Sequence, residues 1–443
     1  MIEDDMVLSS MAATESELEI NGLMLEGQRL VGIGDLLEDA DRVGKLDSPL
    51  AEEFLMIALG TYRPVIEASQ EGFFRQVGSS IKKVFVAIYD FFKKLIHKIA
   101  EWMGFRMAQG TAAIKQLGNH EASRAKKYAK IISEQESNDR VYTDAKDKLK
   151  ALTKSLKDKE KSGSPSSALV DLRAIVEVRN KLVVRAQGEA LDKIQKDLER
   201  EVKSGVFLLG SSYLVGFKGE ESVDDTVEAL GFLLDTTSER IARLHDVATD
   251  FSNFSEERDL RDLIGSVTEL SNVTNENRDS LDRMDNEVIL TPGFKARFTP
   301  ELSAGSDDAH FKYFSMNPTF EKVKAREKAA SPLPVKEHQR AVRTEEQKTS
   351  TYVPRLTSLV ETTKAGVDQL ERMDSDKSAV KYAILDGIME DMDDGRDKET
   401  LYGLRKLIQK IHKDMAAEYR FVTQLQEFYI RYATAVISFP ATP

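Results

Sequence analysis

The chain has 443 residues, of which 41% are hydrophobic and 31% are charged, a composition typical of a globular protein with a charged, helix-rich surface. It contains no cysteine, which excludes disulfide bonds, thiolate metal sites and cysteine nucleophiles. No apolar stretch reaches the roughly 18 residues of a membrane-spanning helix, and the acidic first residues lack the features of a signal peptide. We therefore expect a protein of a reducing cytoplasm or of a virion.

The net charge of −12 lies entirely in the first 71 residues. This region holds sixteen Asp and Glu residues against four Lys and Arg residues, whereas the charges of the remaining chain balance. Pro49 and Pro64 divide it into short patterns that predict two or three short helices. Such a sharp change in composition marks a domain boundary, so we expect residues 1–71 to be a separate acidic region.

A basic amphipathic segment follows at residues 72–106. Its apolar residues recur every three or four positions from Val77 to Met103, which places them on one face of a helix. Two interpretations remain open: a helix that lies on an anionic membrane or docks to a partner, and a core-facing helix of a bundle. Under the first interpretation the binding residues are Ile81, Lys82, Lys83, Phe85, Phe92, Lys93, Lys94 and Trp102.

Long amphipathic helices are predicted over residues 107–285, which we expect to form a helical domain. A polar helix covers 107–161, and a Ser/Gly/Pro joint separates it from one long helix that ends at Ser204. Apolar residues at helical spacing predict two further helices, around 223–247 and 260–270.

Residues 286–318 interrupt the helical pattern with β-like segments and a turn at Thr291, so a small β-rich insert is expected there. The C-terminal helical domain, residues 319–443, is expected to begin with a short helix and to end with a long one from about Glu399 to Phe439. The predicted fold class is mainly α: elongated helical bundles with long amphipathic helices and the small insert.

The sequence contains none of the local motifs that mark a metal, phosphate or nucleophile site, and no pair among its many carboxylates is singled out for acid–base chemistry. The six histidines form no metal-ligand pattern, and phosphate-binding glycine loops and nucleophile elbows are absent. Basic residues are mostly interleaved with acidic ones, as on a solvated helix face, and give no strong nucleic-acid footprint. We therefore expect a protein that is not an enzyme and that needs no cofactor or metal.

The junction at Ser69, Gln70 and Glu71, followed by Gly72, has a small residue two positions before a glutamate. The same pattern at Ala13 and Glu15, and at three other places, shows that it is not specific by itself. Glu71 is singled out because the charge balance changes there, immediately before the basic amphipathic segment. An ordinary polar turn is the alternative interpretation.

This layout resembles the internal head proteins of giant tailed phages, also known as inner-body or prohead core proteins. The resemblance is carried by the small-x-Glu site at Glu71, by the Phe-, Ile- and Lys-rich run from Ile81 to Leu95, and by the β-like run from Val288 to Lys295. It implies that residues 1–71 are a propeptide, that the prohead protease cuts after Glu71, and that Glu15 is a secondary cleavage site.

The resemblance also implies where the protein acts and what it meets. Its partners would be the phage head scaffold and capsid proteins and the prohead protease, first in the host cytoplasm and then inside the capsid. Packaged DNA would lie nearby without sequence-specific binding, and the protein would be ejected with it. Self-association and contact with an anionic membrane surface are further interactions that this layout allows.

Two other functions remain open. One is a membrane-active helical effector that uses the amphipathic helix of residues 72–106. The other is a cytoplasmic helical scaffold protein, in which the same helix is simply part of the core.

Overall fold

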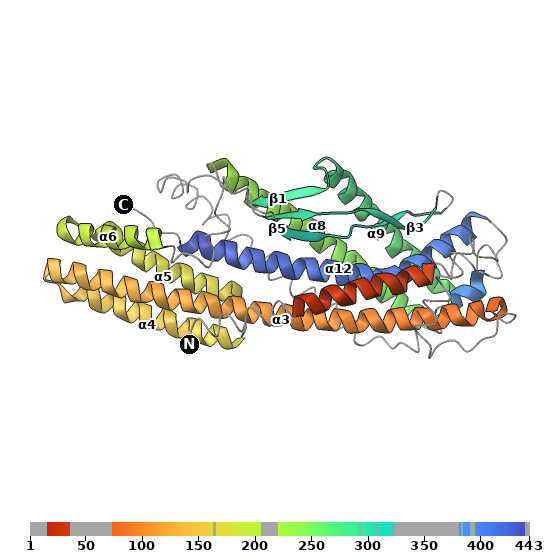
Figure 1. The fold of residues 1–443 in the computed structure, drawn as a ribbon, viewed down its shortest axis with the longest axis horizontal. Helices are drawn as coiled ribbons and strands as arrows, with labels where there is room; N and C mark the ends of the chain where they lie inside the picture. The colour runs from red at the N-terminus through yellow and green to blue at the C-terminus, as the bar shows by residue number, and fades with distance from the viewer. Residues whose placement is uncertain are drawn as a thin grey trace.

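The computed structural model describes residues 16–35, 73–162, 165–204, 220–291, 294–306, 309–322, 381, 384–389 and 395–438. The described residues form long helices and two small antiparallel sheets, so the mainly α fold class is confirmed. Figure 1 shows an elongated molecule whose longest helices run along its long axis.

Two long helices, α3 (Phe73–Glu136) and α12 (Arg396–Ser438), pack along each other and form the axis of the molecule (Figure 1). The 64 residues of α3 extend over about 96 Å at the α-helical rise of 1.5 Å per residue. The boundary expected at residue 106 falls inside α3. Because the helix continues to Glu136 without interruption, residues 72–106 are not a structural unit of their own.

One end of the molecule is a bundle in which α3 packs against α4 (Asp139–Ser162), α5 (Pro165–Arg185) and α6 (Gly188–Ser204). The prediction of one long helix ending at Ser204 is wrong, because the chain breaks between α5 and α6. Helix α5 ends at Arg185, and Gly188, the first residue of α6, has a φ of +50°, a left-handed conformation that glycine adopts at little cost.

At the other end, α12 packs against α8 (Glu220–Asn253), which is joined to α9 (Leu260–Asp282) through the short 3-10 helix η2 (Glu257–Asp259). Both helices predicted for this region are confirmed, and both are longer than their apolar patterns indicated.

The predicted β insert is confirmed and consists of two sheets. Strands β1 (Glu287–Thr291), β2 (Phe294–Arg297) and β5 (Thr319–Lys322) form one sheet in the order β1-β2-β5, and β3 (Glu301–Ala304) pairs with β4 (Tyr313–Ser315) in the other. The prediction of a helix starting at residue 319 is wrong for β5. Pairing with β2 places Phe320 beside Phe294, and both rings pack on Phe428 of α12, an interaction that only the assembled fold supplies.

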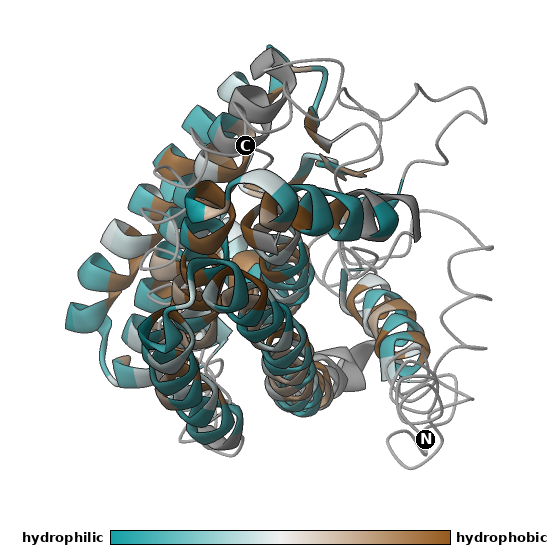
Figure 2. Cartoon of the chain, turned by 90° about the vertical axis from the view of Figure 1, so that its left-hand side faces the viewer, coloured by the Kyte–Doolittle hydropathy of each residue, from teal (hydrophilic) through white to brown (hydrophobic). Residues whose placement is uncertain are grey.

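The buried apolar residues form one continuous core rather than separate domain cores. Helix α12 lies at its centre, and Figure 2 shows the hydrophobic stripes that run along the amphipathic helices. The apolar face predicted for the last helix is buried in full: Leu404, Ile408, Ile411, Met415, Tyr419, Val422, Leu425, Tyr429 and Tyr432.

Candidate functional site beneath the N-terminal helix

A helix formed by residues 16–35, which we term the cover helix, lies alongside α3 and α12 although it belongs to the acidic N-terminal region (Figure 1). Ile20, Met24 and Val31 are buried and lie on one face, at spacings of four and seven residues. Leu18 and Leu25 are exposed, so the helix is amphipathic with its apolar face against the body. The surface that it covers, formed by α3 and α12, is termed the covered groove.

Gly27 marks the closest approach of the cover helix to α3. A Cβ atom at this position would lie 2.7 Å from Cζ of Phe92 and 2.9 Å from Cε1 of Phe91, closer than real side chains come. Gly22 and Gly32, on the same helix, have no such neighbour within 4 Å. Glycine is therefore required for close packing at position 27 and not at positions 22 and 32.

Ion pairs between acids of the cover helix and bases of the body surround this apolar contact. Glu19 pairs with Lys98 of α3, and Glu17 lies 3.5 Å from the Arg106 guanidinium. Farther along, the carboxylate of Asp35 lies 3.0 Å from the ammonium of Lys410 in α12. In each pair the acid comes from the cover helix and the base from the body. Only the Glu19–Lys98 pair is exposed on both sides, and such a pair stabilises by about 0.2–1 kcal/mol. In the other two pairs the bases are mostly buried, with side-chain exposed fractions of 12% for Arg106 and 13% for Lys410.

Arg420 of α12 lies near Glu17 of the cover helix. Burial lowers the pKa of its guanidinium, while the charge of Glu17 raises it. Its Nε atom has no hydrogen-bond partner among the described residues. A pocket of about 320 Å³ lies beside Arg420. It is lined by cover-helix residues, among them Met24 and Gln28, and by the segment around Pro318. Arg420 is therefore a partly desolvated cation at the edge of the covered groove.

While the cover helix is in place, Phe92 and Trp102 do not face a membrane or a partner protein, contrary to the expectation from the sequence. Both are buried, with exposed fractions of 0% and 3%, because this face of α3 packs into the core. Tyr89, on the same face, meets the ring of His412 in α12 at 4.7 Å. From residue 86 onward, α3 is thus a core-facing bundle helix, as the alternative interpretation held.

The other predicted binding residues are less buried or lie outside the described part. Lys94 is exposed and Lys93 is partly buried. Ile81, Lys82, Lys83 and Phe85 belong to α3, but their side chains lie outside the described part of the chain.

The predicted cleavage positions all lie outside the described residues. This holds for Ser69, Gln70, Glu71 and Gly72, and for Ala13 and Glu15. The described cover helix and the described start of α3 lie on either side of the Glu71 junction.

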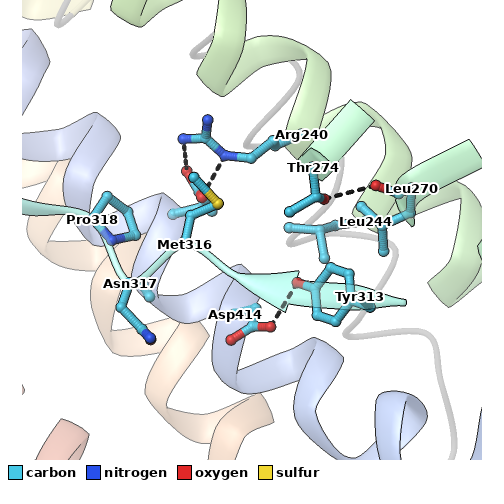
Figure 3. Close-up of a pocket in the computed structure, with 11 residues that line it drawn as sticks. Arg240, Leu244, Leu270, Thr274, Tyr313, Met316, Asn317, Pro318 and Asp414 are labelled. Atoms are coloured by element: carbon cyan, nitrogen blue, oxygen red, sulfur yellow. Dashed lines mark hydrogen bonds and ion pairs between the residues drawn. The ribbon is translucent and has the colours of Figure 1, made fainter. Parts of the chain in front are cut away.

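A second polar cluster is buried where α8, β4 and α12 meet (Figure 3). The Arg240 guanidinium donates to both carboxylate oxygens of Glu418, at 2.8 and 3.1 Å. Tyr313 and Ser315 donate their hydroxyl protons to Asp414 at 2.6 and 2.7 Å. Burial raises the pKa of the Asp414 carboxyl, and its hydrogen bonds lower it by less.

This buried cluster has almost no free volume. The cavity that it lines measures about 10 Å³, roughly the space of one water molecule. Its hydrogen bonds join β4 to α12, and its ion pair joins α8 to α12, so the cluster fixes the β insert on the long helix. Removing one partner of such a buried pair typically costs about 3–5 kcal/mol, because the other charge is left uncompensated.

No protein-family model, curated protein or solved structure matches this chain.

The described residues contain no group of three or more His, Asp or Glu side chains placed to hold a metal ion. None of the helices they form combines the length and apolarity needed to cross a membrane.

Of the residues that make the covered groove, Phe92 was predicted from the sequence to bind a membrane or partner, whereas Lys98, Arg106, Lys410 and Arg420 were not singled out. The spacing of Ile20, Met24 and Val31 was a usable signal for an amphipathic helix. Nothing local to Lys410 or Arg420 indicated that they would meet acids from a segment almost 400 positions earlier.

Proposed function

We propose that this protein is a non-enzymatic internal head protein of a tailed phage, made as a precursor whose residues 1–71 are removed by the prohead protease after Glu71. One observation carries the proposal: the cover helix, on the acidic side of Glu71, is bound to a basic groove on the charge-balanced body. An acidic helix that is docked on the body by complementary charges has the properties of a removable cover.

Removal of residues 1–71 would change the body in two ways. It would take away the whole net charge of −12, which repels packaged DNA at short range. It would also uncover Lys98, Arg106, Lys410 and Arg420 together with the apolar surface around Phe92. The mature protein would then present a site that the precursor keeps covered during assembly.

The test is the N-terminus of the mature protein. Co-expression with the prohead protease encoded by the same genome should give a chain that begins at Gly72, detected by intact mass and N-terminal peptide analysis. Glu71→Gln should block this cut, whereas Glu53→Gln, at another small-x-Glu site, should not. Virion protein that retains residues 1–71 would contradict the proposal.

A helical scaffold protein is the second candidate, and the burial of Phe92 and Trp102 favours it over a membrane-active effector. In a scaffold the cover helix would be a permanent part of the fold. An uncut chain in its natural source would support this candidate.

A further inference from the structure

We propose that the covered groove, once the cover helix has left it, is a docking site for an acidic amphipathic helix of a partner protein. The inference rests on the proposed removal of residues 1–71 for the occasion on which the groove becomes free. The cover helix itself shows which chemistry the groove accepts, because it is the ligand bound there in the uncut chain.

The first requirement that the groove places on its occupant is steric. Phe91 and Phe92 approach the cover helix so closely that a Cβ atom at position 27 would force their rings to shift. The occupant therefore needs a glycine on its apolar face at this point, with large apolar residues one turn before and after. In the cover helix these are Met24 and Val31, both buried.

The second requirement is electrostatic. Lys98 and Arg106 lie near one end of the occupant and Lys410 near the other, and each meets an acid of the cover helix. Arg420 adds a partly desolvated cation with an unpartnered Nε atom among the described residues. Arg106 also keeps Glu427 of α12 as a partner, at 3.3 Å, so Lys98, Lys410 and Arg420 contribute most to the preference. A basic helix would place like charges against them, so charge complementarity selects an acidic helix.

The covalent link between the cover helix and the body controls which helix occupies the covered groove. While the cover helix is tethered to the body, its local concentration excludes a helix supplied from solution. Cutting the tether removes that advantage without changing any contact. An acidic helix from solution can then replace the cover helix in the covered groove if its effective concentration is higher.

The experiment uses full-length chains and a fluorescently labelled synthetic peptide of residues 14–36. Gly27→Val should displace the chain's own helix, and Gly22→Val is the matched control because its Cβ meets nothing within 4 Å. Fluorescence anisotropy should show that the Gly27→Val chain binds the peptide, with the control chain about tenfold or more weaker because its own helix competes. Equal binding by the two chains would overturn the proposal.

Charge is tested with a second peptide that carries Glu17→Lys and Glu19→Lys. Its affinity for the Gly27→Val chain should fall about fivefold or more, as expected for the loss of two partly exposed ion pairs. Lys98→Glu in the chain should recover part of this loss. An unchanged affinity would overturn the assignment to an acidic helix.

A second route avoids any substitution in the cover helix. A site for a sequence-specific protease is inserted after Lys45, and the folded wild-type chain is cut there. The cut chain should exchange its helix for the labelled peptide, whereas the uncut chain should not. Failure of the cut chain to exchange would overturn the proposal even if Gly27→Val prevents folding.

Two other occupants are outcomes of the same experiment. A Gly27→Val chain that dimerises in light scattering would assign the groove to a second copy. A short DNA duplex that displaces the peptide at equal concentration would assign the groove to nucleic acid. Either result would overturn a partner helix as the occupant.

The measurements use neither the prohead protease nor virions, so the two proposals fail separately. Lack of peptide binding would leave processing at Glu71 standing. Uncut virion protein would leave the chemical preference of the groove standing.

Discussion

At the scale of single residues, two buried histidines oppose protonation of the folded protein. Burial lowers the pKa of His412 to about 4, and its Nε2 has no hydrogen-bond partner among the described residues. Burial also lowers the pKa of His245 to about 4, although the nearby charge of Asp246 raises it. His245 lies against the hydroxyl of Tyr419. The imidazole rings of His245 and His412 are therefore both held neutral inside the core.

The folded pKa of each ring is below the unfolded value of 6.5, so the unfolded chain takes up protons first as the pH falls. The free energy of unfolding should therefore be unaffected by these groups above about pH 6.5 and fall between about pH 6.5 and 4, by on the order of 3 kcal/mol per histidine. His412→Gln should flatten the profile of urea unfolding against pH in this window by up to about 1.4 kcal/mol per pH unit. The control is the exposed His120→Gln, which should keep the wild-type profile. A His412→Gln profile as steep as wild type would contradict the prediction.

At the scale of helices and strands, the local patterns and the packing agree for α8, α9 and α12 and disagree at two places. Apolar spacing predicted helices in all these regions, because the 3.6-residue period is a property of neighbouring residues. The break between α5 and α6 was missed, since Gly188 follows a continuous apolar pattern. β5 was predicted as a helix, because its aromatic contacts with β2 and α12 come from distant parts of the chain.

Gly104 and Gly118, two of the four glycines of α3, provide a matched test of its packing. A Cβ at Gly118 would lie 2.4 Å from Cδ1 of Leu156 in α4, whereas one at Gly104 would meet nothing within 4 Å. Gly104→Ala should raise the free energy of unfolding by about 1 kcal/mol, through helix propensity alone. Gly118→Ala has the same gain but must displace Leu156, so its stability should be about 1–3 kcal/mol below that of Gly104→Ala. Chemical denaturation measures both, and equal stabilities would show that the α3–α4 contact is looser than described.

At the scale of the whole molecule, the elongated shape follows from α3. A single helix of 64 residues is far longer than the diameter of a compact domain, and shorter helices pack against each of its halves. The continuous core along this axis shows why the sequence boundaries at residues 106 and 286 do not separate independent cores.

Small-angle X-ray scattering tests this architecture. A compact protein of 443 residues would have a radius of gyration of about 22 Å. The value for this chain should be clearly larger, with a maximum dimension of at least about 96 Å set by the length of α3. A radius of gyration near the value for a compact protein, about 22 Å, would mean that α3 is bent or broken in solution.

The sequence by itself determined the mainly helical class, the small β insert, the apolar face of α12 and the charge break at Glu71. These features depend on residue type and on spacing along a few turns, which a linear pattern records. The tertiary structure decided that Phe92 and Trp102 are core residues, and that Glu17 and Asp35 meet Arg106 and Lys410. Those pairings join segments from opposite ends of the chain. They arise only when several amphipathic faces compete for burial, and local periodicity does not determine which faces meet.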